Sequence, residues 1–199
     1  GTRENRFKPV RIPLLRGVID VQAGGEHSVA MRRDGSVFTW GSNQYGQLGL
    51  PEFDSVATPV RLHVLKAISA VACGADHILA LDRDGNVFAW GSNDKGQLGD
   101  HSYIDRREPV HISDLSHITA IEAGYLHSLA LNDIGTVYAW GSNENGQLGI
   151  EGVQNSTEAL GVTSLRRPAS EIFSGGYNSF ALDKTGLLFS WGYLYSGTP

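Results

Sequence analysis

Hydrophobic residues in this chain recur in short runs in which large apolar side chains alternate with small or polar ones. Residues 28–32 and 36–40 are two such runs, and Arg-Asp-Gly at 33–35 separates them. Alternation with a period of two is typical of strands, and a short glycine-containing link between two strands predicts a tight hairpin. A further apolar run at 18–23 predicts a third strand. Helical periodicity does not compete with this pattern, so the sequence predicts an all-β protein.

The strand pattern repeats along the whole chain. Comparing residues 74–99 with 124–149, 16 of 26 positions are identical. A unit that begins with G-x-x-H/N-S/I-x-A-L/M and ends in F/Y-x-W-G occurs at 24–41, 74–91, 124–141 and 175–192. Ser-Asn-x-x-Gly-Gln-Leu-Gly follows it three times, at 42–49, 92–99 and 142–149. A fixed period of this length is the signature of a repeat architecture.

Each repeat of about 50 residues contains enough strands for one small sheet. A Pro-Val segment opens the unit and can form an edge strand, where proline is tolerated. A four-stranded sheet of this size cannot bury both of its faces, so neighbouring copies must stack, and a radial array of such sheets is a β-propeller. The sequence predicts one partial β-propeller over residues 1–199, with repeat units at roughly 9–58, 59–108, 109–158 and 159–199.

Composition narrows the classes of function. The chain has 199 residues, 41% hydrophobic content and a formal net charge of −5, which argues against disorder and against binding a polyanion by bulk charge. Nucleic acid is therefore not the expected partner. The single cysteine, Cys73, excludes an internal disulfide framework, and the apolar run that it ends predicts a buried, unreactive thiol. We expect an intracellular protein of the cytoplasm or nucleus, without a membrane span, a cofactor or a small-molecule substrate.

The combination A-G-G-x-H-S-x-A, D-G-x-V-x-x-W-G and G-Q-L-G resembles the repeats of the regulator of chromosome condensation family, and the resemblance covers essentially the whole chain. The resemblance implies a seven-bladed propeller, of which about four blades are present here as a partial array. It also implies a face that meets the small GTPase Ran in the nucleotide-exchange member of the family. In that member the residue just before the repeated histidine lies on this face, which maps the contact to Asp76 first and to Glu26 next.

Residues that recur at fixed positions are expected to hold the fold. The tryptophans suit packing between blades, since large aromatic residues at repeat spacing are usually core. They are Trp40, Trp90, Trp140 and Trp191, at intervals of 50, 50 and 51 residues. His27, His77 and His127 could form a three-histidine zinc site. The fourth copy has Asn178 instead, which is not a zinc ligand, so we interpret these residues as hydrogen-bonding groups that hold the backbone of a neighbouring blade and predict no metal site.

Residues that vary between fixed positions are the candidates for binding. The pair before each His or Asn differs in every copy, and this variation at one loop tip of every blade favours a recognition surface, although loops also vary without a function. The candidates in these pairs are Glu26, Asp76, Tyr125, Leu126 and Tyr177.

A second variable region links each Gly-Gln-Leu-Gly to the next Pro-Val. It offers an aromatic and charged mixture of the kind that interfaces use, although these segments could equally be plain linkers. The candidates are Phe53, Tyr103, Arg106 and Arg107.

The sequence shows no catalytic constellation, and an enzymatic role would at most be that of a guanine-nucleotide exchange factor. We predict a protein-interaction module that binds a small GTPase of the Ran or Rab type, and this prediction leaves room for promotion of guanine-nucleotide exchange. The alternative is a non-enzymatic scaffold that recruits substrates within a larger multidomain protein.

Overall fold

In a computed structural model, which describes residues 4–5, 7–13 and 15–193, the strands form four separate antiparallel sheets. Sheet 1 contains β1 (Val18–Ala23), β2 (His27–Arg32), β3 (Val37–Ser42) and β4 (Ser55–Arg61). Sheet 2 contains β5 (Ile68–Cys73), β6 (His77–Asp82), β7 (Val87–Gly91) and β8 (Arg106–His111). Sheet 3 contains β9 (Ile118–Ala123), β10 (His127–Asn132), β11 (Val137–Ser142) and β12 (Asn155–Gly161). Sheet 4 has three strands within the described residues: β13 (Ala169–Ser174), β14 (Asn178–Asp183) and β15 (Leu188–Gly192).

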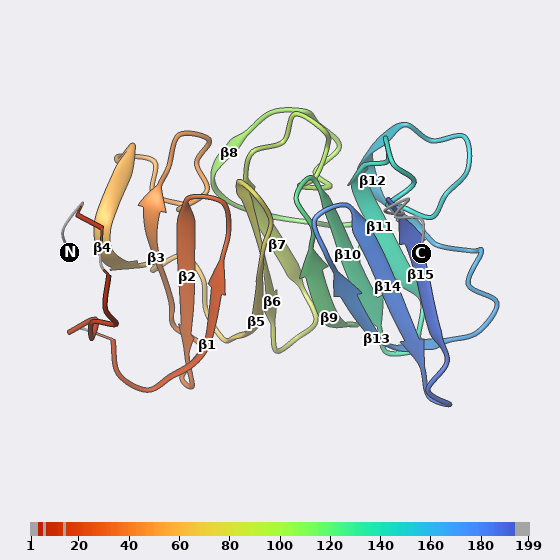
Figure 1. Ribbon diagram of the computed structural model, residues 1–199, viewed down its shortest axis with the longest axis horizontal. Coiled ribbons are helices and arrows are strands. Elements are labelled where there is room, and N and C mark those ends of the chain that lie inside the picture. The colour runs from red at the N-terminus through yellow and green to blue at the C-terminus, as the bar shows by residue number, and fades with distance from the viewer. Residues whose placement is uncertain (1–3, 6, 14, 194–199) are drawn as a thin grey trace.

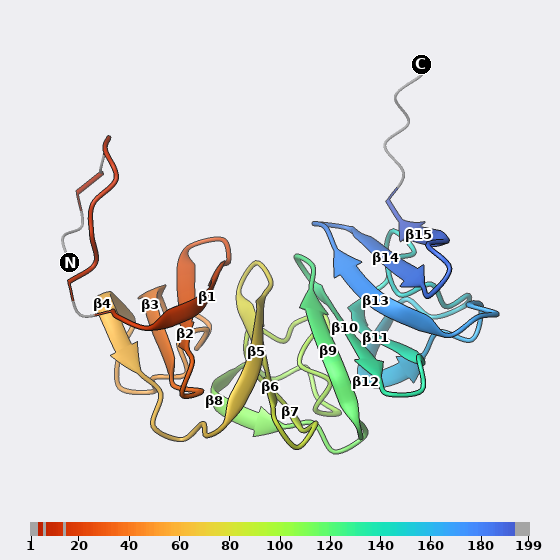
Figure 2. The same ribbon diagram turned by 90° about the horizontal axis from the view of Figure 1, so that it is seen from below.

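The four sheets stand next to one another (Figure 1), and the row that they form is curved into an arc (Figure 2). The first strand of each sheet, β1, β5, β9 or β13, lies on the concave side, and β4, β8 and β12 lie on the convex side (Figure 2). Each of these inner strands contacts the inner strand of the next sheet. A radial series of small antiparallel sheets is the propeller architecture, so the predicted all-β propeller fold is confirmed.

The hairpin predicted at residues 33–35 connects β2 to β3. Gly35 has a φ of 81°, a left-handed conformation that favours glycine, and its N–H donates to the carbonyl of Arg32 at 2.9 Å. A Cβ atom on Gly35 would lie 2.9 Å from the backbone nitrogen of Ile68 in sheet 2. Glycine is therefore required here both by the turn and by the close approach of the neighbouring sheet.

The Pro-Val segments join a different sheet from the one that the repeat units imply. Pro59 and Val60 lie in β4, the outermost strand of sheet 1, where Val60 pairs with Thr39 of β3. Each complete sheet thus ends with the first strand of the following sequence unit, and Pro9 and Val10 form no strand. The outermost position suits proline because that strand needs no N–H donor on its outer side.

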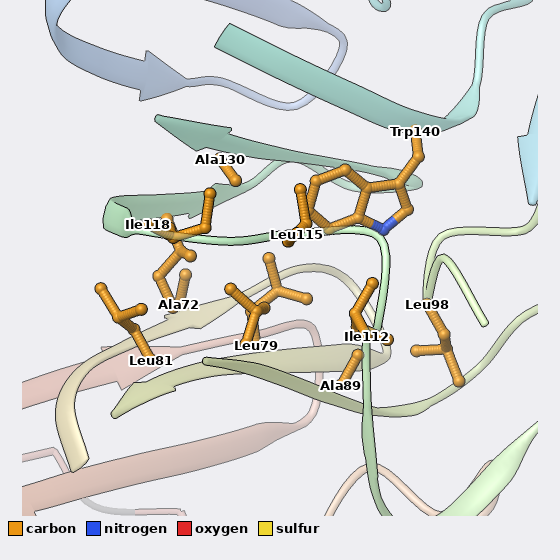
Figure 3. Packing of buried hydrophobic residues seen from close by; sticks show 12 residues of the cluster. Ala72, Leu79, Leu81, Ala89, Leu98, Ile112, Leu115, Ile118, Ala130 and Trp140 are labelled. Atoms are coloured by element: carbon orange, nitrogen blue, oxygen red, sulfur yellow. The ribbon is translucent and has the colours of Figure 1, made fainter. Parts of the chain in front are cut away.

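Apolar clusters fill the space between neighbouring sheets. Between sheets 2 and 3, Leu79 and Ala89 face Ile118 and Trp140 (Figure 3). Burial of a side chain such as Leu79 stabilises the fold by about 1.5–3 kcal/mol. Because alternate residues of a strand point to opposite faces, every interior sheet contributes to the junction on each of its sides.

The repeated tryptophans also carry hydrogen bonds across these junctions. The indole N–H of Trp140 donates to the carbonyl of Gln97, in the loop of the preceding sheet, at 2.9 Å. Trp90 and Trp191 make the same bond to the carbonyls of Gln47 and Gln147, at 3.1 and 2.8 Å. Each of these three indoles therefore connects its sheet to the Gly-Gln-Leu-Gly loop of the preceding sheet. Trp40, in sheet 1, is only half-buried.

The outer faces of the first and last described sheets show what such a junction covers. Val21 of β1 is 60% exposed, whereas Val71, its counterpart in sheet 2, is 5% exposed because sheet 1 covers it. At the other end of the arc Leu188 is exposed, whereas its counterpart Val87 is completely buried. The positions that are core at an internal junction thus form apolar surface at both ends of the described array.

Candidate partner-binding face

Both variable regions of the repeat lie along one edge of the sheets. His27 begins β2 and pairs with Gly41 near the end of β3, so the β1–β2 turn and the β3–β4 loop emerge at the same edge. The β2–β3 hairpin tips and the connections between sheets lie at the opposite edge. We call the first edge the rim face; it is the upper edge in Figure 1.

The backbone of the rim is held by hydrogen bonds that run from one sheet to the next. The N–H of Gly25 donates to the carbonyl of Ala75 at 2.8 Å, Ala75 donates to Tyr125 at 3.1 Å, and Tyr125 donates to Gly176 at 2.8 Å. These four residues are the first members of the four variable pairs. Backbone hydrogen bonds therefore fix these four positions without using their side chains. The four residues line a hollow of about 220 Å³ on the concave side.

The part of the rim contributed by sheets 1 and 2 is acidic. Glu26 is exposed and Asp76 is half-buried, and the side-chain amide of Gln47 donates to Oδ1 of Asp76 at 3.1 Å. Partial burial raises the pKa of Asp76 above its usual value, the bond from Gln47 acts in the opposite direction, and the negative charge of Glu26 raises it further. Gln47 thus orients one oxygen of the rim carboxylate, a role that its place in the repeated loop sequence did not indicate.

The part contributed by sheets 3 and 4 is aromatic. The rings of Tyr125 and Tyr177 meet edge to face, with centroids 5.3 Å apart and an angle of 86° between the ring planes. Tyr125 is 53% and Tyr177 39% exposed, and Leu126 is half-buried next to Tyr125 in sequence. The Tyr125 ring lies over Gly176, where a Cβ atom would be 2.9 Å from the ring. The structure therefore brings these two tyrosines together as one exposed aromatic pair.

Beneath the rim, two of the three repeated histidines connect neighbouring sheets. Nε2 of His77 lies 3.0 Å from Oγ of Ser128, and this hydroxyl donates to the carbonyl of Gln97 at 2.7 Å. Because the serine hydrogen is directed at that carbonyl, the imidazole must donate, which assigns the Nε2–H tautomer. His127 makes the same contact with Ser179, at 2.9 Å. The expected backbone acceptor is therefore replaced by a serine hydroxyl, which itself binds the backbone.

His27 lacks this arrangement because Ile78 occupies the position of the serine. Its ring is 3% exposed, and neither nitrogen has a hydrogen-bond partner. Burial lowers the pKa of His27 and His127 to about 4 and the pKa of His77 to about 3. All three rings are consequently neutral at pH 7. In the fourth copy Asn178 instead donates from its side chain to the carbonyl of Tyr193.

In the second variable region, two arginines make hydrogen bonds within the protein and two aromatic side chains are exposed. Nε of Arg106, the first residue of β8, forms an ion pair at 2.6 Å with Asp100 in the loop that precedes this strand. Arg107 donates to the carbonyl of Phe53 at 3.0 Å and contacts Asp54 at 3.3 Å, which connects sheet 2 to the loop of sheet 1. Phe53 and Tyr103 are exposed. The two arginines thus brace the loops, while the two aromatic rings remain available for contact.

The Cys73 thiol lies on the concave side at the end of β5. Burial raises its pKa, and the negative charge of Asp20 adds to this effect. Such a thiol has little thiolate character at neutral pH. Within the described residues, no helix has the length and apolar character that a membrane crossing requires.

Comparison with known proteins agrees with this geometry. Rat alsin is 46% identical over 50 residues, which are 24% of this chain and 3% of alsin. The mouse regulator of chromosome condensation is 43% identical over 44 residues, 22% of this chain and 10% of that protein. The chain therefore matches a small part of each relative's length.

Solved structures give longer matches. Human WBSCR16 superposes with a TM-score of 0.79 at 26% identity, over 88% of this chain and 47% of that one. Prp20p from Saccharomyces cerevisiae has a TM-score of 0.78 at 24% identity, over 92% of this chain and 48% of that one, and shows the shared fold. The family described as the RCC1-like domain matches residues 1–198. The repeats, the radial sheets and this match together show that the chain belongs to the RCC1-like domain family.

Proposed function

We propose that the rim face binds a small GTPase of the Ran or Rab type and promotes release of its nucleotide. The observation that carries the proposal is the juxtaposition on one fixed backbone of an acidic pair, Glu26 and Asp76, and an aromatic pair, Tyr125 and Tyr177. A protein interface of this composition joins electrostatic steering to a rigid aromatic anchor.

Asp76 supplies the acidic contact. Gln47 holds one carboxylate oxygen, and the half-buried position reduces the competition of water for the other. A lysine that binds phosphate in the nucleotide-loaded GTPase would pair with Asp76 once the nucleotide has left. This contact would favour the nucleotide-free state and so accelerate release of GDP. Glu26 adds negative charge to the approach of that lysine.

Tyr125 and Tyr177 supply the apolar contact, and Leu126 follows Tyr125 in the sequence. Exposed tyrosines contribute large contact area at a small cost in side-chain entropy, and they are enriched among residues that dominate binding energy. Phe53 and Tyr103 extend the same face outward along the loops. Together these side chains come from all four sheets.

The relatives support this proposal. One carries the name regulator of chromosome condensation, and the structure of Prp20p is described together with its binding to Gsp1p and histones. Those properties belong to the proteins named. For this chain the GTPase and the exchange step rest on the side chains of the rim.

The test is release of a fluorescent GDP analogue from a panel of Ran-type and Rab-type GTPases. We expect acceleration by the unaltered chain and a loss of about tenfold or more in the double variant Glu26→Ala/Asp76→Ala, because a charged contact at an interface contributes roughly 1.5–3 kcal/mol. The matched control is Asp84→Ala/Asp133→Ala, which removes two exposed carboxylates from the opposite edge and should leave the rate unchanged.

A second variant separates binding from exchange. Tyr125→Ala/Tyr177→Ala should weaken retention of the GTPase in a pull-down, while Glu26→Ala/Asp76→Ala should reduce release more than retention. If no GTPase responds and none is retained, the exchange proposal fails for this chain. The alternative, a scaffold that recruits a different protein through the same face, then becomes the better interpretation.

A further inference from the structure

A separate cluster of metal-ligating side chains lies at the junction between sheets 2 and 3. His101 belongs to the β7–β8 loop, Asp114 to the β8–β9 connection and Glu158 to β12. All three residues are exposed, and one ligand atom from each lies within 4.8 Å of the other two. Three segments that are distant in the sequence thus meet at one point beside the outer strands.

The imidazole of His101 stands between the two carboxylates. Its Nε2 is 2.8 Å from Oδ2 of Asp114, and its Nδ1 is 3.9 Å from Oε2 of Glu158. The backbone N–H of His101 donates to the carbonyl of Thr157 at 2.9 Å, which fastens the loop of sheet 2 to the strand that carries Glu158. The arrangement is therefore set by the backbone of two sheets.

This trio is not part of the repeating scaffold. The corresponding positions at the junction between sheets 1 and 2 hold Pro51, Val64 and Glu108, which cannot form such a site. Fold maintenance alone therefore does not call for an imidazole and two carboxylates at this place. The glutamate recurs at both junctions, whereas the imidazole of His101 and the carboxylate of Asp114 are particular to the junction between sheets 2 and 3.

We propose that His101, Asp114 and Glu158 bind a divalent transition-metal ion of the Zn²⁺ type, with water completing the coordination. One imidazole nitrogen and two carboxylate oxygens suit Zn²⁺, and three protein ligands with an open position for water are a recurrent zinc arrangement. Two carboxylates also balance the charge of the ion. Binding would replace the direct contact of His101 with Asp114 by one bond from each residue to the metal, and Glu158, whose ligand atom lies within 4.8 Å of the other two, would supply the third bond.

A bound ion at this place would connect sheet 2 to sheet 3. The alternative is an ion-pair network in which a protonated His101 bridges the two carboxylates without a metal. Exposed ion pairs contribute little to stability, whereas a metal that binds only the folded state stabilises it in proportion to its affinity and concentration. The two interpretations therefore predict different responses to added metal.

The first measurement is a calorimetric titration of the 199-residue chain, cleared of metal with a chelator, with ZnCl₂ at pH 7.5. We expect one Zn²⁺ per chain, and a loss of affinity of at least about tenfold in His101→Ala and in Asp114→Asn. The matched control is His63→Ala, which removes an exposed histidine from the connection between sheets 1 and 2 and should leave the site intact.

Two further readouts guard against non-specific binding. Co²⁺ in place of Zn²⁺ should give visible absorption bands of a coordinated ion in the parent chain and in His63→Ala, and not in His101→Ala. Zn²⁺ should raise the thermal unfolding midpoint of the same two proteins and leave that of His101→Ala unchanged. Absence of a one-to-one site in the parent, or equal affinity in His101→Ala, would overturn the proposal and leave an ion-pair network.

Discussion

The junction between sheets 1 and 2 differs from the two junctions that follow it. At the second and third junctions a histidine, a serine and a loop carbonyl form a relay across the sheets. At the first junction Ile78 replaces the serine and His27 has no partner. There the side chain of Gln47 crosses to Asp76 instead, whereas the side chain of Gln97 stays within its own loop, near Ser92 and Asp94.

The difference shows how one repeat can serve both the fold and a candidate site. Where the buried relay is present, the glutamine contributes its backbone carbonyl to the junction. Where the relay is missing, the glutamine side chain also crosses the junction and holds a rim carboxylate. Asp76, which we propose as a GTPase contact, is therefore held by a hydrogen bond that crosses the first junction.

The largest expected effect comes from the three neutral, buried histidines. Their pKa values are depressed in the folded chain, so below about pH 6.5 the unfolded chain binds more protons, and stability falls as the pH decreases toward 4. Each contributes about 1.4 kcal/mol per pH unit, or about 4 kcal/mol for the three between pH 6 and 5. Urea unfolding at pH 7, 6 and 5 measures this slope, and His77→Leu should reduce it by about one third. An unchanged stability between pH 7 and 5 would contradict the buried, neutral assignment.

The second effect concerns the serine of the relay. Ser128→Ala leaves the Nε2–H of His77 without an acceptor in a buried site, so we expect a loss of about 2 kcal/mol in the free energy of unfolding. Ser28→Ala is the matched control in sheet 1, where no relay exists, and should cost a few tenths of a kcal/mol. Chemical denaturation of both variants tests the comparison. Equal losses would mean that the relay contributes nothing beyond packing.

The third prediction concerns His27, a buried histidine whose replacement should not lower the stability of the fold. His27→Leu removes a buried imidazole that has no hydrogen bond, so it should leave stability unchanged or increase it by up to about 1 kcal/mol. The same substitution at His77 breaks the bond to Ser128 and should be destabilising by about 1 kcal/mol. Thermal unfolding at pH 7 distinguishes the two. A clearly destabilised His27→Leu would contradict the interpretation that the imidazole of His27 adds no stabilising hydrogen bond.

The smallest effect is electrostatic. Gln47→Met removes the bond that lowers the pKa of Asp76, so this pKa should rise further above its usual value. Gln97→Met, at the second junction, is the matched control and should leave the Asp76 titration unchanged. NMR titration of the Asp76 carboxyl carbon measures both. A shift of equal size in the pKa of Asp76 in both variants would contradict a specific effect of the Gln47 hydrogen bond on this carboxyl.

Much of the fold was accessible from the sequence because its determinants are local or periodic. The spacing of Trp40 and its counterparts indicates stacked repeats, and Gly35 marks a hairpin whatever surrounds it. The sheet that contains Pro59 was not accessible in the same way, because a strand can pair with either neighbour and only the assembled sheets decide. The boundaries of the sequence repeat therefore differ from those of the structural blade, because the strand that contains Pro59 pairs with the preceding sheet.

The candidate site shows the same division. Asp76 and Tyr125 could be assigned to one rim because the repeat places equivalent residues on equivalent turns. The bond from Gln47 to Asp76 spans 29 residues and had no signal in the sequence except the constancy of the glutamine. The ion pair of Arg106 with Asp100 was likewise invisible, since a pair of adjacent arginines is equally compatible with a free basic surface.

The backbone ladder through Gly25, Ala75, Tyr125 and Gly176 has a consequence for how such proteins diversify. The ladder uses only main-chain atoms, so side chains beside it can be exchanged without altering the spacing between blades. A single substitution beside the ladder can then change the charge or polarity of the rim face while the framework keeps its geometry. The surface chemistry of the rim face can therefore change one blade at a time.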